Sequence, residues 1–304
     1  MSVLSRPDVL VLGVGGVLGE AWMSGYLAGA SASTGIDFRD IGCFVGTSAG
    51  SIVAARLVAG LPLEPPGGSG STAVSGPSVG AEGLPRPRRS RVTRGVGLPA
   101  AAALRVGSPA GALVRSVLLG RVPEGRIALE ALRARIARWG ARFDGRLLVA
   151  AVDRRDGRRV VFGSPGGPAA GVADAVAASC AVPGVFRPVR IGLREYVDGG
   201  VWSPTNLDIA PVSAGSRVLC LVPTAALEAA PALLFRGLAR WWRAATAIEA
   251  AAARGAGAQV TIVEPDGLAA ATMAGDLMDP GPREQVAAAG FAQGLAAAGG
   301  SDRD

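Results

Sequence analysis

The apolar positions of the chain fall into short blocks, and the first two blocks share one arrangement. Residues 8–12 and 41–45 have the length and apolar composition of buried strands. A glycine-rich segment follows each of them, at residues 13–19 and 46–50, and apolar residues then recur at helical spacing, in the first case from Glu20. The pattern predicts two units in which a buried strand turns sharply into a helix.

The same alternation continues along the chain. Further strands are expected at residues 146–152, 158–162, 218–222 and 259–263, and further helices at residues 129–139, 171–179 and 232–254. Strands that alternate with helices predict an α/β fold of three layers, in which a mainly parallel central sheet is flanked by helices on both faces.

The length of 304 residues and the hydrophobic content of 49% suit one such domain, which we expect at residues 8–265. Residues 62–97 are rich in Pro, Gly, Ser and Arg and have no hydrophobic period, so they are predicted to form a flexible or lid-like insertion. Residues 266–304 are expected to be a C-terminal helical or disordered tail.

Two residue types are missing, and their absence excludes several mechanisms. The chain has no histidine and no lysine, so every basic side chain is an arginine. Without histidine there is no Ser-His-Asp or Cys-His catalysis and no imidazole metal site. Without lysine there is no pyridoxal phosphate Schiff base and no Walker A loop. The three cysteines are far apart in sequence, and we expect neither a metal nor an organic cofactor.

The net charge of +7 favours an anionic partner. Arginine clusters such as residues 86–94 contain no aromatic residue for base stacking, so nucleic acid is not expected as a partner. The predicted helix at 232–254 carries Arg236, Arg240 and Arg243 on one stripe and apolar residues, among them Trp241, near another. Two interpretations stay open: contact with an anionic membrane surface, or a solvated arginine face with core-facing tryptophans.

The N-terminus lacks the features of a signal peptide, and no apolar run of the chain reaches the ~18 residues of a membrane span. The expected compartment is the cytoplasm, and any membrane contact should be peripheral.

The candidate nucleophile is Ser48, within Gly46-Thr47-Ser48-Ala49-Gly50. This G-x-S-x-G pattern lies on a predicted strand-to-helix turn, where small neighbours permit a strained elbow that exposes the serine hydroxyl. The amides at the start of the following helix would favour a developing oxyanion.

The candidate base is Asp198. Because histidine is absent, a carboxylate must accept the serine proton. Asp198 ends a short apolar segment and precedes Gly199 and Gly200, which let backbone approach closely. Partial burial would raise its pKa toward a useful value, although a D-G-G sequence also commonly serves only to start a turn.

A glycine-rich loop after the first strand, followed by G-T-S-A-G and D-G-G, resembles the patatin-like phospholipases in order and spacing. The segment 178–188, with Pro183-Gly184 and Phe186 after a helix, is similar to the family's stretch before the catalytic aspartate, and the resemblance covers about residues 8–210. It implies lipid ester hydrolysis by a Ser48–Asp198 dyad. It also implies an oxyanion hole built from the backbone amides of Gly15, Gly16 and Ala49, and it makes Gly19, Gly46, Gly50, Gly199 and Gly200 motif residues.

Two positions depart from the family's Gly-Gly-Gly-x-Arg-Gly loop: Val14 replaces the first glycine and Leu18 stands at the arginine position. They leave phospholipid preference open, and they support a rival function as a non-catalytic lipid-binding protein. Carboxylesterase or thioesterase activity also stays open, because the chemistry at the carbonyl is shared. A dinucleotide-binding fold is a weaker rival, because G-x-G-x-x-G would require a glycine at Leu18.

Overall fold

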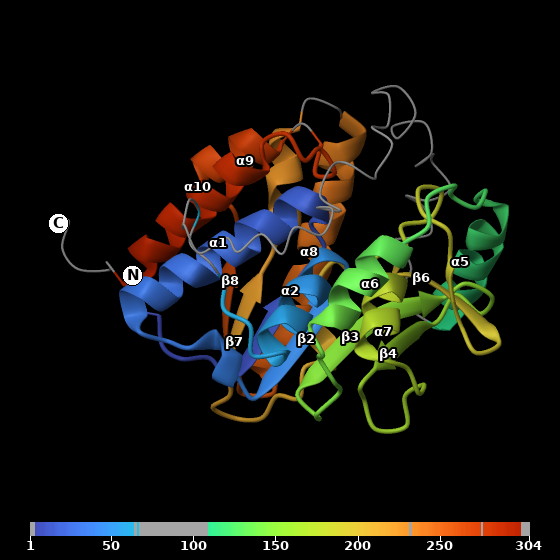
Figure 1. Ribbon diagram of the computed structural model, residues 1–304, viewed down its shortest axis with the longest axis horizontal. Coiled ribbons are helices and arrows are strands. Elements are labelled where there is room, and N and C mark those ends of the chain that lie inside the picture. The colour runs from blue at the N-terminus through green and yellow to red at the C-terminus, as the bar shows by residue number, and fades with distance from the viewer. Residues whose placement is uncertain (1–3, 64–65, 67–108, 231–232, 275, 299–304) are drawn as a thin grey trace.

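The computed structural model describes residues 4–63, 66, 109–230, 233–274 and 276–298 (Figure 1). The insertion predicted at residues 62–97 therefore lies almost entirely outside the described residues. The remainder contains the expected alternation of strands and helices.

Eight strands of the described residues form one sheet. Hydrogen-bonded neighbours follow the path β5-β6-β3-β2-β1-β7-β8, and β4 also pairs with β3. Neighbours from β3 through β2, β1 and β7 to β8 are parallel, whereas β4, β5 and β6 pair antiparallel. The strands are β1 (Val9–Leu12), β2 (Cys43–Thr47), β3 (Leu147–Asp153), β4 (Arg159–Phe162), β5 (Val189–Ile191), β6 (Arg194–Asp198), β7 (Arg217–Leu221) and β8 (Gln259–Val263).

The central strands are buried on both faces, which explains their continuous apolar sequences. Along β1, Leu10 and Leu12 belong to the core on one face, while Val9 and Val11 belong to the core on the other, as the two-residue period of a strand requires.

Helices cover both faces of this sheet, which confirms the three-layer α/β fold (Figure 1). One face carries α1, α2, α6 and α7, and the other carries α5 and α8. The described α-helices are α1 (Gly16–Thr34), α2 (Ala49–Val58), α5 (Pro109–Arg121), α6 (Glu130–Arg138), α7 (Val172–Ser179), α8 (Leu233–Gly255), α9 (Gly267–Met273) and α10 (Arg283–Leu295). Short 3-10 helices are η1 (Phe38–Asp40), η2 (Gly199–Val201), η3 (Leu207–Ile209), η4 (Pro223–Ala229) and η5 (Ala296–Ala298).

The C-terminal helix α10 lies along α1, so the two ends of the described chain pack together (Figure 1). Glycines make this close approach possible. A Cβ on Gly25 would lie 2.2 Å from the carbonyl oxygen of Ala287, and one on Gly29 would lie 2.1 Å from that of Phe291. In the reverse direction a Cβ on Gly294 would lie 2.1 Å from the carbonyl oxygen of Tyr26. The region expected as a tail thus contributes a helix that packs against the core.

Several sequence predictions need correction. The first helix begins at Gly16, not Glu20, because close packing of Gly15 and Gly19 against Pro223 outweighs the low helix propensity of glycine. The second strand is Cys43–Thr47, two residues later than expected, and so reaches the residue before Ser48. Helix α5 and strands β5 and β6 were not predicted.

On α8 the predicted arginine stripe is exposed, at Arg236, Arg240 and Arg243, and Trp241 is half-buried. Ile248, another apolar residue of this helix, is 71% exposed. The apolar face of α8 therefore does not extend to Ile248.

Strands β2 and β6 meet end to end along one edge of β3. Thr47, the last residue of β2, pairs with Ala150, and Asp198, the last residue of β6, pairs with the next residue, Ala151. Strand β4 pairs with this stretch of β3 as well and occupies its other edge. Because β2 is parallel and β6 antiparallel to β3, their carboxyl ends converge, and this convergence positions the candidate site.

Candidate active site

Ser48 lies in a sharp turn between β2 and α2. Its backbone has φ 52° and ψ −123°, a conformation that costs an L-residue energy and is typical of a nucleophile elbow. The turn requires small neighbours: a Cβ on Gly46 would lie 2.5 Å from the Cα of Ser51, and one on Gly50 would lie 2.0 Å from the carbonyl oxygen of Leu12. The motif glycines 46 and 50 thus have a steric role in forming the elbow.

A second serine supports the elbow from α7. The backbone N–H of Ser48 donates to Ser179 Oγ at 2.8 Å, and this hydroxyl donates to the carbonyl oxygen of Ala150 at 2.6 Å. Ser179 is fully buried and ties the nucleophile's backbone to β3. Sequence reasoning gave Ser179 no role. The only signal for it was its place at the end of a helix of small residues, before Cys180.

Asp198 ends β6 and is 3% exposed. Its Oδ1 accepts a hydrogen bond from the N–H of Gly200 at 2.7 Å, whereas Oδ2 is buried without a hydrogen-bond partner among the described residues. Desolvation by burial raises the pKa of Asp198 to about 7, and the Gly200 amide and the nearby Ser48 hydroxyl oppose this rise. Ser48 is therefore close enough to favour the ionised form of Asp198, yet the two side chains fall short of full hydrogen-bond geometry.

The glycine-rich loop between β1 and α1 lies against both motifs. The N–H of Gly50 donates to the carbonyl oxygen of Gly13 at 3.2 Å, which joins the loop to the elbow. A Cβ on Gly200 would lie 2.7 Å from Val14 Cγ2, which places the D-G-G turn on the other side of the loop. The structure thus brings together three segments that are far apart in the sequence.

Three backbone amides remain available at this junction. The N–H groups of Gly15, Gly16 and Ala49 make no hydrogen bond with any described residue. Gly16 and Ala49 are the first residues of α1 and α2, where unpaired amides and the positive end of the helix dipole favour a negative charge.

Leu18 is fully buried and belongs to the core. Its N–H donates at 3.0 Å to the carbonyl oxygen of Leu277, in the segment between α9 and α10. A Cβ on Gly16 would lie 2.8 Å from Met278 Sδ, so this segment packs directly over the start of α1. The position at which the family has an arginine is here part of the apolar core.

A family model described as patatin-like phospholipase matches residues 10–211. The chain belongs to the patatin-like phospholipase family. The match extends from β1 beyond the D-G-G turn and so includes the glycine-rich loop, Ser48 and Asp198. No curated protein matches the chain.

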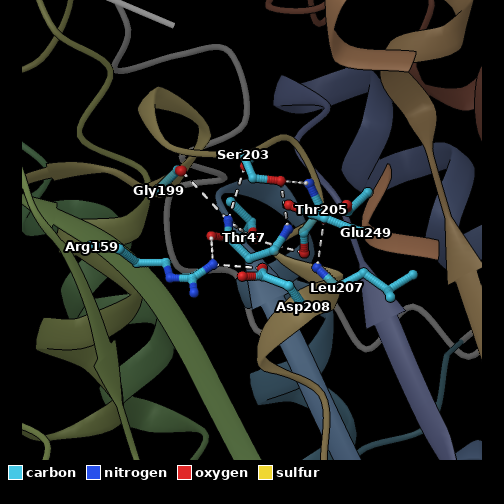
Figure 2. A network of polar contacts seen from close by, with 9 residues as sticks. Thr47, Arg159, Gly199, Ser203, Thr205, Leu207, Asp208 and Glu249 are labelled. Atoms are coloured by element: carbon cyan, nitrogen blue, oxygen red, sulfur yellow. Dashed lines mark hydrogen bonds and ion pairs between the residues drawn. The ribbon is translucent and has the colours of Figure 1, made fainter. Parts of the chain in front are cut away.

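In this patatin-like domain, a polar network that sequence reasoning missed adjoins Thr47 and Gly199, the chain neighbours of Ser48 and Asp198 (Figure 2). Its centre is Asn206, eight residues after Asp198, and it also contains Thr47, Ser203, Thr205 and Glu249. Asn206 could have been noticed as the chain's only asparagine. Glu249 lies on α8 and no local pattern indicates it.

The described residues include no group of three or more His, Cys, Asp or Glu side chains suited to a metal ion. All three cysteines are free and buried. No described helix has both the length and the apolar character to cross a membrane.

Proposed function

We propose that the chain is a serine carboxylic-ester hydrolase that cleaves lipid acyl esters with Ser48 as nucleophile and Asp198 as base. The observation that carries the proposal is the junction of two buried side chains: Ser48, 5% exposed on a strained turn, and Asp198, 3% exposed with one carboxylate oxygen that lacks a partner among the described residues. Membership of a family of lipid acyl hydrolases supports the substrate class.

The chemistry follows from this arrangement. Ser48 Oγ attacks the ester carbonyl carbon while Asp198 accepts the hydroxyl proton. The resulting oxyanion accepts hydrogen bonds from the amides of Gly15, Gly16 and Ala49. Asp198 returns the proton to the leaving alcohol as the C–O bond breaks, and water then hydrolyses the acyl-enzyme with Asp198 again as base. A pKa of about 7 suits a group that must both accept and release a proton near neutral pH.

The substrate class is a phospholipid, a lysophospholipid or a neutral lipid. The buried Leu18 leaves no arginine at that position of the loop to meet an anionic head group. We therefore expect acyl hydrolysis with weak selection for a phosphate-bearing head group. Ser48 is 5% exposed, so only a small part of this residue is open to an approaching ester.

Peripheral contact with an anionic membrane surface is part of the proposal. Arg236 and Arg240 are exposed along α8 and can face lipid phosphates. Arg243 already forms ion pairs with Glu228 at 3.0 Å and Glu264 at 2.9 Å, so its charge is largely compensated.

The proposal is tested by hydrolysis of a medium-chain p-nitrophenyl ester and of a mixed-chain phospholipid in vesicles. Wild-type protein is compared with Ser48→Ala and Asp198→Asn, each checked for fold by circular dichroism. Loss of turnover in both variants supports the dyad. The ratio of the hydrolysis rates on the two substrates reports the head-group preference. A wild-type protein that binds vesicles but releases no acid or alcohol would instead favour the lipid-binding alternative.

A further inference from the structure

We propose that Asn206 is a positioning residue that fixes the spacing between Ser48 and Asp198 from behind the dyad. The inference rests on the proposed function and adds to it a residue that touches neither catalytic side chain.

The amide nitrogen of Asn206 connects the chain segments next to both dyad residues. Nδ2 donates to Thr47 Oγ1 at 3.1 Å, and it approaches the carbonyl oxygen of Gly199 at 3.5 Å. It also donates to the carbonyl oxygen of Ser203 at 2.9 Å. Thr47 immediately precedes Ser48, and Gly199 immediately follows Asp198. One planar amide group therefore contacts the end of β2 and the start of the D-G-G turn.

The orientation of this amide group is set by charge on its other side. Arg159 Nη1 donates to Asn206 Oδ1 at 3.3 Å and to Asp208 Oδ1 at 2.6 Å (Figure 2). Arginine has only donors, so Oδ1 must face Arg159 and Nδ2 must face Thr47.

The backbone of Asn206 is also specialised. It has φ 49° and ψ 35°, in the left-handed region that asparagine tolerates better than most residues. The side chain is fully buried. Ser203 Oγ accepts from the N–H of Asn206 at 3.0 Å and from that of Thr205 at 3.3 Å, which holds the turn in this conformation.

Glu249 anchors the turn to α8 (Figure 2). Its Oε2 accepts from Thr205 Oγ1 at 2.7 Å and from the N–H of Leu207 at 2.9 Å, so the residues on both sides of Asn206 are fixed to one carboxylate. In addition, Thr47 Oγ1 donates to the carbonyl oxygen of Thr205 at 3.3 Å. The turn that presents Asn206 is thus tied both to a helix and to β2.

The contacts of Asn206 bear on the spacing between Ser48 and Asp198. Because the Asp198 Oδ2 atom makes no full hydrogen bond within the described part of the chain, no such bond between the two side chains fixes the spacing of Ser48 and Asp198. The chain segments at Thr47 and Gly199 set it, and Asn206 contacts the Thr47 side-chain hydroxyl and the Gly199 carbonyl oxygen. Displacement of a catalytic group by about 1 Å can reduce a rate about a hundredfold, so loss of this contact should reduce kcat and leave KM nearly unchanged.

Two variants distinguish loss of the Asn206 side-chain contacts from loss of the fold. Asn206→Asp keeps the size, the left-handed tolerance and the acceptor toward Arg159 but removes the Nδ2 donor. Asn206→Gly keeps the left-handed backbone and removes the whole side chain. The matched control is Gln293→Glu, which makes the same amide-to-carboxylate change at a partly buried side chain that binds Trp22 and the backbone of Glu264 on another part of the molecule.

The experiment measures kcat and KM for a p-nitrophenyl ester well below the melting temperature of each variant. It also follows the carboxyl titration of Asp198 by carbon NMR in wild type and Asn206→Gly, with Asp198→Asn to assign the signal. We expect kcat to fall about a hundredfold in both Asn206 variants with KM within about twofold, the control to stay within about twofold, and the Asp198 midpoint to move toward its ordinary value.

If wild type is active and both Asn206 variants stay within about threefold of it in kcat, the inference is wrong and the proposed function stands. If wild type is inactive but the Asp198 midpoint moves in Asn206→Gly, the positioning role stands and the proposed function is wrong. An inactive wild type with an unmoved midpoint contradicts both.

Discussion

Ser48 and Asp198 come together because the strands that lead to them end against adjacent residues of one neighbouring strand. Thr47 pairs with Ala150 and Asp198 pairs with Ala151, from opposite strand directions along the same edge of β3. A serine and an aspartate 150 positions apart in sequence are thereby placed by backbone pairing, before any side-chain contact forms. Under the proposed function, this pairing brings the nucleophile and the base together without a histidine between them.

The pH dependence of hydrolysis should follow Asp198. Burial raises its pKa to about 7, and only the ionised form can accept the Ser48 proton. The ratio kcat/KM should therefore rise about tenfold per pH unit below the pKa and level off above it. A profile measured with a neutral p-nitrophenyl ester checks this. A half-maximal rate near the ordinary Asp value would show that Asp198 is not the base.

Asp198 should also cost stability at alkaline pH. The pKa of Asp198 is about 7 in the folded state and 3.8 in the unfolded state. Its contribution to stability is therefore fully present below pH 3.8 and is lost as the pH rises through about 7. Asp198→Asn should therefore be more stable than wild type near pH 8, by on the order of 4 kcal/mol, with the difference closing near pH 4. Urea unfolding at both pH values measures this difference in stability. A difference that does not change with pH would contradict the claim that ionisation of the buried Asp198 carboxyl costs stability.

Removal of the Ser179 hydroxyl should weaken both fold and activity. Ser179→Ala leaves the amide of Ser48 and the carbonyl of Ala150 without a partner in a buried place, at a cost of about 2–4 kcal/mol. The control Ser116→Ala removes an exposed hydroxyl that only bonds within its own helix, and it should change stability by less than about 0.5 kcal/mol. Urea unfolding measures the stability of the two variants. Equal losses of stability would show that Ser179 does not support the turn at Ser48.

The close packing of α10 on α1 should make the protein sensitive to added side-chain volume at Gly29. In Gly29→Ala the new Cβ would lie 2.1 Å from the carbonyl oxygen of Phe291, so the two helices must separate, at a cost of about 3 kcal/mol or more. Gly237→Ala is the matched control because that helical glycine has open space around it, and it should stabilise the protein by about 1 kcal/mol. Thermal unfolding distinguishes them. A harmless Gly29→Ala would mean that α10 does not pack closely in solution.

The sequence predicted the three-layer fold because its central strands are apolar on both faces and its glycine turns follow them directly. It did not reveal helix α5, whose apolar residues Leu113, Val114 and Val117 are exposed and so give no clear amphipathic pattern. It also placed the start of α1 too late, since Gly16 and Gly19 read as loop residues until their contacts with other segments are known.

For the candidate site, the sequence indicates Ser48 and Asp198 because each lies in a short motif, the first after a predicted strand and the second after a short apolar segment. Ser179, Asn206 and Glu249 could not be predicted, since their roles depend on hydrogen bonds between segments tens of residues apart. Local patterns carry no information about such partners.

The proposed mechanism makes Ser48 Oγ the nucleophile, and covalent labelling of that oxygen tests it. The protein is incubated with a long-chain fluorophosphonate, which reacts with activated serine hydroxyls, and the modified peptide is located by mass spectrometry. We expect one adduct, on Ser48, that is absent in Ser48→Ala and forms much more slowly in Asp198→Asn. No adduct, or an adduct on another serine that persists in Ser48→Ala, would contradict the proposed mechanism.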